Sequence, residues 1–133
     1  MSDDRRLVVA GWLFAAGSAI HLFDHLRRGQ TSITDQLYWA GNLALIVQVV
    51  VITLILTRHR QAPLLAACAG FPLALGFLAA HWLPHWSSLS DSFVDQHAAL
   101  FSWFASASEI AGALAVGVVG LTIVRRRGLA SFG

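Results

Sequence analysis

The chain has 133 residues, of which 56% are hydrophobic and only 12% are charged, and its mean hydropathy is +0.65. A water-soluble domain usually carries about 25% charged residues, so this composition indicates a membrane protein. The formal net charge of +2 comes from arginines beside the apolar segments, so it does not call for a nucleic-acid partner.

Four apolar segments occupy most of the sequence, and each can form a helix that crosses the roughly 30 Å hydrocarbon core of a bilayer. An α-helix satisfies its own backbone hydrogen bonds, as lipid requires. We therefore predict an all-α polytopic membrane protein, a bundle of four transmembrane helices that forms one domain over residues 1–133. The predicted helices cover about residues 7–28, 35–57, 62–83 and 95–124.

The sequence HLFDH at residues 21–25 lies near the end of the first apolar segment, where a membrane helix usually carries leucine or valine. At 100° per residue, His21, Asp24 and His25 fall on one face of this helix. Two histidines four residues apart suit a divalent metal ion, and the carboxylate can be a further ligand or can orient an imidazole. These residues are the first candidates for a polar site inside the membrane.

Several residues mark the expected helix ends. Gly29 follows the last arginine of the first helix and suits a C-cap. The sequences SITD (32–35) and SFVD (92–95) each place a serine three residues before an acid, which resembles a capping box. They predict the starts of the second and fourth helices. Pro84 is expected to end the third helix.

Glu109 lies deep in the fourth apolar segment, far from any other charged residue. A bare carboxylate at that depth is costly, so we expect it to be protonated, paired or bound to another group. Ser102, Ser106 and Gly112 share its helix face, and small residues at such spacing let two helices approach closely in lipid. Glu109 is therefore expected to face the interior of the bundle.

A rise of 1.5 Å per residue gives the depth of each polar residue in the predicted helices. A deeper layer, about 21–22 Å from the cytoplasmic ends, holds His21, Asn42 and Glu109. We therefore predict that His21 and Glu109, on antiparallel helices, face each other. An outer layer, about 25–28 Å from those ends, holds Asp24, His25 and His81, with His85 and His97 at its rim.

The arginines predict the orientation of the helices. Seven of the nine lie beside one set of helix ends, and two, Arg27 and Arg28, lie beside the other. The positive-inside rule then places both termini in the cytoplasm and residues 84–94 outside. We predict location in a bacterial inner (plasma) membrane, with Trp86 and Phe93 at the membrane–water interface.

The polar residues suggest first a metal or haem site that opens outward. Imidazole and carboxylate ligands suit Zn, Cu or Fe, and haem would take His25 and His81 as axial ligands. Tyr38 and Trp39 are expected to wall a pocket near the outer layer. The predicted metal ligands are His21, His25, His81 and Glu109, and the predicted cofactor-binding residues are His25, His81, Asn42 and Tyr38.

Two other classes of function remain open on the sequence. One is a metal-free membrane enzyme in which His21, Glu109 and Asp24 act as general acid and base on a lipid-soluble substrate. The other is an accessory or transporter subunit, in which the polar residues hold helices together or relay protons. The expected partners are the lipid bilayer, a lipophilic small molecule, and a second copy of the chain or a partner membrane subunit.

Overall fold

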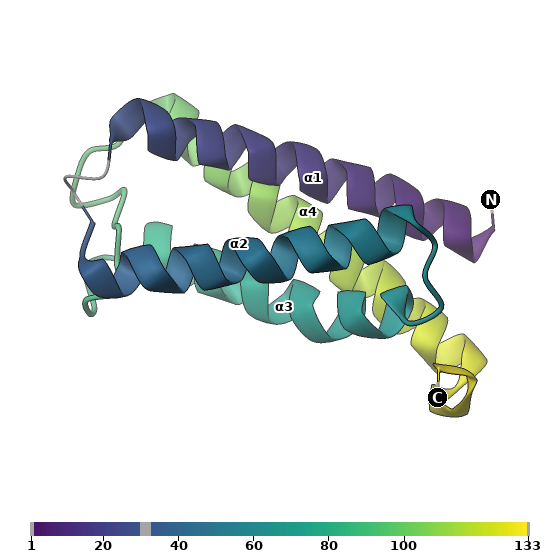
Figure 1. The fold of residues 1–133 in the computed structure, drawn as a ribbon. Helices are drawn as coiled ribbons and strands as arrows, with labels where there is room; N and C mark the ends of the chain where they lie inside the picture. The colour runs from purple at the N-terminus through teal and green to yellow at the C-terminus, as the bar shows by residue number, and fades with distance from the viewer. Residues whose placement is uncertain (1, 30–32, 133) are drawn as a thin grey trace.

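The computed structural model describes residues 2–29 and 33–132, and within these ranges the regular structure is helical, with no strand. Each α-helix is long and apolar enough to cross a membrane, judged by length and composition. This confirms the predicted all-α four-helix bundle and is consistent with an integral membrane protein. The elements are α1 (Asp3–Arg28), α2 (Asp35–Leu56), α3 (Ala62–His81), α4 (Leu100–Arg127) and the 3₁₀ helix η1 (Leu129–Phe132) (Figure 1).

Helix α1 begins at Asp3, earlier than the predicted residue 7, because its N-terminus is capped. The Ser2 hydroxyl accepts a hydrogen bond from the Arg5 N–H at 3.4 Å, and the acidic residues of the first turn favour the helix dipole. Its C-terminus lies where the sequence predicts it. Gly29 has a φ of 78°, and its N–H donates to the His25 carbonyl at 3.0 Å.

Helices α2 and α3 agree closely with the predicted ranges. Ser32, the predicted cap of α2, lies outside the described residues, and the N-cap is Thr34, whose hydroxyl accepts from the Leu37 N–H at 3.1 Å. Helix α2 ends one residue before the prediction, and α3 ends two residues before it, at His81. Pro84 therefore follows the end of α3 and does not define its last residue.

The predicted start of α4 at residue 95 is wrong. The Ser92 hydroxyl accepts from the Asp95 N–H at 3.2 Å, but this bond closes a turn in the segment before the helix. Helix α4 begins at Leu100 and runs three residues past the predicted end, to Arg127. Gly128, with a φ of 78°, ends it by donating its N–H to the Val124 carbonyl at 2.9 Å.

Helix α4 forms close contacts with both α1 and α3 through glycines. A Cβ atom at Gly112 would lie 2.6 Å from the Cα of Phe14 on α1. A Cβ atom at Gly120 would lie 2.6 Å from the carbonyl oxygen of Pro63 on α3. The backbones therefore approach as closely as small residues permit, as the small-residue face of the fourth segment predicted.

Helix α2 packs more loosely, at the side of the other three. Its buried residues are Gln48, Val51 and Ile55, all in its second half. The first half, from Asp35 to Val47, is exposed or half-buried throughout. A groove therefore separates this half of α2 from its neighbours.

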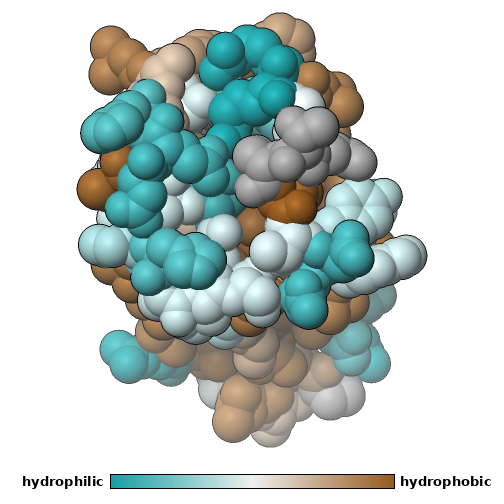
Figure 2. Space-filling model, turned by 90° about the vertical axis from the view of Figure 1, so that its left-hand side faces the viewer, coloured by the Kyte–Doolittle hydropathy of each residue, from teal (hydrophilic) through white to brown (hydrophobic). Residues whose placement is uncertain are grey.

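The helix ends divide the bundle into a terminal end and a loop end. Both chain termini lie at the terminal end, and the segment 82–99 between α3 and α4 lies at the loop end (Figure 1). Arg126 and Arg127 pair with Asp3 and Asp4 at 3.1 and 2.9 Å and tie α4 to the start of α1. Figure 2 shows the loop end, where hydrophilic side chains cover much of the face and hydrophobic ones surround them. The predicted orientation, with the loop end outside, stays a prediction.

Candidate functional site

Three histidines form a cluster inside the bundle near the loop end. His21 and His25 are one turn apart on α1 and their rings stack, with centroids 4.6 Å apart. His81, the last residue of α3, brings its ring to 4.8 Å from His21 and 5.6 Å from His25. One nitrogen of each imidazole lies within 4.8 Å of the other two. The sequence predicted His21 in a deeper layer than His25 and His81. In the structure the side chains bridge this difference in depth, and the three rings lie together.

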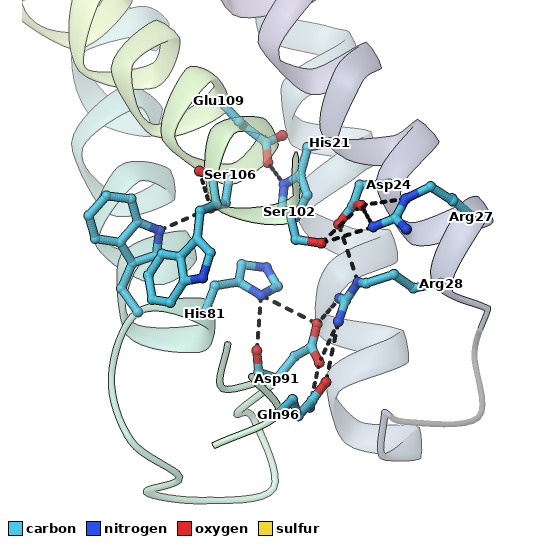
Figure 3. A network of polar contacts seen from close by, with 12 residues as sticks. His21, Asp24, Arg27, Arg28, His81, Asp91, Gln96, Ser102, Ser106 and Glu109 are labelled. Carbon is cyan, nitrogen blue, oxygen red and sulfur yellow. Dashed lines mark hydrogen bonds and ion pairs between the residues drawn. The ribbon is translucent and has the colours of Figure 1, made fainter. Parts of the chain in front are cut away.

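Glu109 contacts the His21 ring from α4. Its Oε2 meets the Nδ1 of His21, and both side chains are buried (Figure 3). The predicted facing of His21 and Glu109 is confirmed. Because Nδ1 is engaged, Nε2 is the remaining ligand atom of this imidazole, and it is buried without a hydrogen-bond partner among the described residues.

The segment 82–99 folds back over the end of α3 and holds His81. The backbone N–H groups of Asp91 and Phe93 donate to the carbonyls of Ala80 and His81, each at 2.8 Å. The Nδ1 of His81 lies 3.3 Å from the Asp91 carbonyl oxygen and 3.4 Å from its carboxylate. Phe93 stacks on the other side of the ring at 4.7 Å and is fully buried. Its side chain therefore packs inside the protein, and its predicted depth at the membrane–water interface stays a prediction.

Asp24 belongs to an ion-pair network that lies beside the cluster. Its carboxylate is fully buried, 2.7 Å from Arg27 and 3.2 Å from Arg28, and it accepts from the Ser102 hydroxyl at 3.1 Å (Figure 3). The Arg28 contact is an ion pair whose atoms lack hydrogen-bond geometry. The structure gives Asp24 guanidinium and hydroxyl partners in place of the imidazole that the sequence suggested.

The Asp91 carboxylate joins the network to the cluster. Arg28 pairs with it from α1, Gln96 donates an amide hydrogen bond to it at 2.9 Å, and His81 lies on its other side. Burial raises the pKa of Asp91, but the contacts with His81 and Arg28 outweigh burial and hold that pKa well below its usual range. Asp91 is therefore an anion between a guanidinium and an imidazole. The sequence carried no signal for it, since it looks like an ordinary loop acid.

Two residues of α2 predicted to border the site lie along the groove. The Asn42 amide donates to the Tyr38 carbonyl of its own helix at 2.8 Å. Both residues line the groove, but among the described residues no hydrogen bond joins Asn42 to His21 or Glu109. Gln48 of α2 does enter the core, and its buried Oε1 has no hydrogen-bond partner in the part of the chain that the structure describes. Like Asn42, it is an amide in the middle of an apolar segment, and this is the signal that could have identified it.

The rim histidines stay apart from the cluster. His85 and His97 are exposed on the segment 82–99, as expected if they are simply hydrated. His85 uses its backbone N–H to bind the Asp95 carboxylate at 2.7 Å. These two imidazoles are thus natural comparison residues for the three that cluster.

The groove beside α2 has a volume of about 900 Å³ and reaches the cluster. Its walls come mostly from α2, α3 and the loop-end half of α1, with Glu109 from α4, and most of the lining residues are aliphatic. His21, His25, His81 and Glu109 all contribute to its lining. The cluster is therefore buried within the helices yet reachable from this side.

No protein-family model matches this chain, and comparison with curated proteins and with solved structures gave no significant match. The function is therefore inferred from the chemistry of the site. Three imidazoles around one point can bind Zn, Cu or Fe, and an imidazole paired with a carboxylate can move a proton.

Proposed function

We propose that the protein is an integral membrane metalloprotein whose metal ion is bound by His21, His25 and His81. The observation that carries this proposal is the convergence of three imidazole nitrogens within 4.8 Å. Zinc–imidazole bonds are about 2.0–2.1 Å long, so ring shifts of about 1 Å would bring all three nitrogens onto one ion. A fourth position would remain for another ligand, as in catalytic metal sites.

The carboxylates behind two of the imidazoles support this proposal. Metal-bound histidines usually give their second nitrogen to a carboxylate or a backbone carbonyl, which fixes the ring and its tautomer. Glu109 occupies this position for His21, and Asp91 occupies it for His81. In this arrangement Glu109 is a positioning residue that acts through His21, in place of the direct ligand predicted from the sequence. An ion would also satisfy the buried Nε2 of His21.

The packing of the three rings favours a single ion over haem. A porphyrin held between His25 and His81 would extend sideways around their midpoint. The His21 ring lies 4.6 and 4.8 Å from those two rings and so occupies that space. The donor set of three imidazoles suits zinc, copper or iron.

Elemental analysis of the purified protein tests the metal site. The wild type should contain zinc, copper or iron in stoichiometric amount, and His21→Ala and His81→Ala should each lose most of it. His85→Ala is the matched control, because its imidazole is exposed outside the cluster, and it should keep the metal. A wild type free of metal, or equal metal content in all three variants, would show the proposal to be wrong.

We also propose that the loop end faces outward from a bacterial inner membrane, with both termini in the cytoplasm. The support is the arginine distribution, seven at the terminal end and two at the loop end. A Ser88→Cys variant in a Cys68→Ala background should react with an impermeant thiol reagent added to intact cells. Reaction only after the membrane is opened would reverse the orientation.

A metal-free acid–base site is the second candidate, and the buried contact between His21 and Glu109 favours it. A proton shared between imidazole and carboxylate could be passed to or from a molecule in the groove. In that case Glu109→Gln would abolish turnover of a lipid-soluble substrate by metal-free protein. Activity that depends on added metal would exclude this candidate.

A further inference from the structure

Resting on the metal site proposed above, we propose that the groove binds a long-chain carboxylic acid. Its carboxylate would take the open position on the metal, and its hydrocarbon chain would lie between α2 and α3.

The shape of the groove fits a single hydrocarbon chain. Its volume of about 900 Å³ is in the range of sites that hold small organic ligands. The α2 wall runs from Leu37 to Val51, a length of about 21 Å at the helical rise. The opposite wall includes Leu65 and Leu73 of α3. A long apolar wall of this kind receives an extended chain better than a compact ring.

The polarity of the groove gives the ligand a direction. Its imidazoles and Glu109 gather at one place, nearer the loop end, while the rest of the lining is mostly aliphatic. A molecule that satisfies both parts has a polar head and an apolar tail. Its tail would point from the cluster toward the terminal end.

The charge of the proposed metal site favours a ligand with an anionic head group. A divalent ion held by three neutral imidazoles and balanced by Glu109 keeps one positive charge. In a low-dielectric interior that charge favours an anionic ligand, and a carboxylate oxygen is a good ligand for these metals.

The depth of the histidine cluster below the loop end favours a ligand with a compact head group. His21 lies seven residues before Arg28, which places it about 10 Å below the loop end of α1. From the loop end the cluster is covered by Asp91 and Phe93, both buried against His81. A head group must therefore come in from the side and below the interface. A carboxylate can do so more easily than the bulky phosphodiester of a two-chain phospholipid.

Two glycines give the groove an open side. Gly41 on α2 and Gly76 on α3 both line it, and both are exposed. A Cβ atom built at either position meets no atom within 4 Å. These positions leave room for a chain, and a side chain can begin at either of them without a clash at its Cβ.

Binding of hexadecanoic acid to metal-loaded protein in detergent tests the inference. Gly76→Phe should weaken binding at least about tenfold, equal to 1.4 kcal/mol, while the metal content stays at the wild-type level. Val118→Phe is the control, because Val118 is exposed on α4 and does not line the groove. It should bind the acid as the wild type does.

The head group is tested with hexadecanol, which has the same chain length without the carboxylate. Wild-type protein should bind it at least about tenfold more weakly than the acid, and chelated protein should bind the two alike. Equal affinity of the metal-loaded protein for acid and alcohol would overturn the carboxylate–metal contact. Undiminished binding in Gly76→Phe would overturn the placement in the groove. Displacement of the acid by a two-chain phospholipid would overturn the choice of a compact carboxylate head.

The metal content of each sample separates the two proposals. Protein that contains metal but does not bind the acid would support the metal site and show that the proposed ligand is wrong. A wild type without metal, or histidine variants whose metal content equals that of the wild type, would show that the metal site itself is wrong.

Discussion

Asp24 and Glu109 are two buried carboxylates at the interface of α1 and α4, and their surroundings differ sharply. Asp24 has two guanidinium groups and a hydroxyl around it. Among the described residues the polar contact of Glu109 is the imidazole of His21, which is neutral or charged according to its proton. Asp24 is thus balanced by fixed positive charge, whereas the balance of Glu109 depends on a titratable partner.

This difference separates a structural carboxylate from one suited to function. The surroundings of Asp24 leave it little freedom to change protonation or partner. Glu109 faces a histidine that lines a groove and whose Nε2 has no hydrogen-bond partner within residues 2–29 and 33–132. Burial alone does not distinguish the two, because both residues are buried.

The largest effect on stability is expected for Asp24→Asn. This change removes the negative charge between Arg27 and Arg28 and should lower the free energy of unfolding by about 3 kcal/mol. The figure is at the low end for a broken buried ion pair, since Arg27 is partly exposed. Thermal unfolding in detergent measures it, and the folded fraction should keep its metal. Loss of metal without loss of stability would reverse the roles of the two carboxylates.

Glu109→Gln should weaken metal binding but leave the stability of the protein almost unchanged. Loss of the carboxylate behind a metal-bound histidine typically weakens metal affinity about 10–100-fold, and we expect a value in that range. The amide can still hydrogen-bond to His21, so the metal-free protein should unfold near the wild-type temperature. Competition with a chromophoric chelator gives the affinity. Unchanged affinity would mean that Glu109 has a purely structural role.

Gly112→Ala should disturb both carboxylates together. The added methyl would overlap the Phe14 backbone and push α1 away from α4, at a cost of about 1–3 kcal/mol. Gly41→Ala is the matched control, because its Cβ meets open space. Thermal unfolding of the two variants should differ by several degrees. Equal unfolding temperatures for the two variants would show that the close approach of α1 and α4 does not contribute to stability.

The smallest effect is expected at Asp95, in the segment 82–99. The backbone N–H of His85 binds its carboxylate and lowers the pKa of Asp95 from 3.8. A lowered folded-state pKa means that the stabilisation is present above pH 3.8 and is lost as the pH falls through the folded-state value. The protection of the His85 amide against hydrogen exchange, relative to its intrinsic rate at each pH, should therefore fall slightly in acid. Asp95→Asn should abolish that acid dependence without affecting metal binding.

The helices and the central pair could be predicted from the sequence because they depend on repeating patterns. Apolar length located four helices, and antiparallel depth brought His21 opposite Glu109. The contacts of Asp91 and Phe93 could not be predicted, because they depend on how a loop without periodicity folds over α3. A helical wheel assigned Asp24 to the histidine face, but its face does not reveal that the neighbouring arginines reach it first.

Asn42 illustrates a second limit of the sequence. Its depth matched that of His21, but depth says nothing about how closely a helix packs against its neighbours. Helix α2 lies at the side of the bundle, and the amide is satisfied by the carbonyl one turn earlier on the same helix. The observed helix ends differ from the predicted ones for a similar reason. Capping depends on contacts with neighbouring residues, which helix propensity does not describe.

The sequence separation of these contacts bears on how the chain is made. Asp24 finds its guanidinium partners within α1, three and four residues away, so its charge is balanced as soon as that helix forms. His21 meets Glu109 only after a further 88 residues. At about 5–20 residues per second, synthesis of that stretch takes roughly 4 to 18 s. We expect α1 to remain beside the insertion machinery over that interval, and the bundle to close only when α4 leaves it.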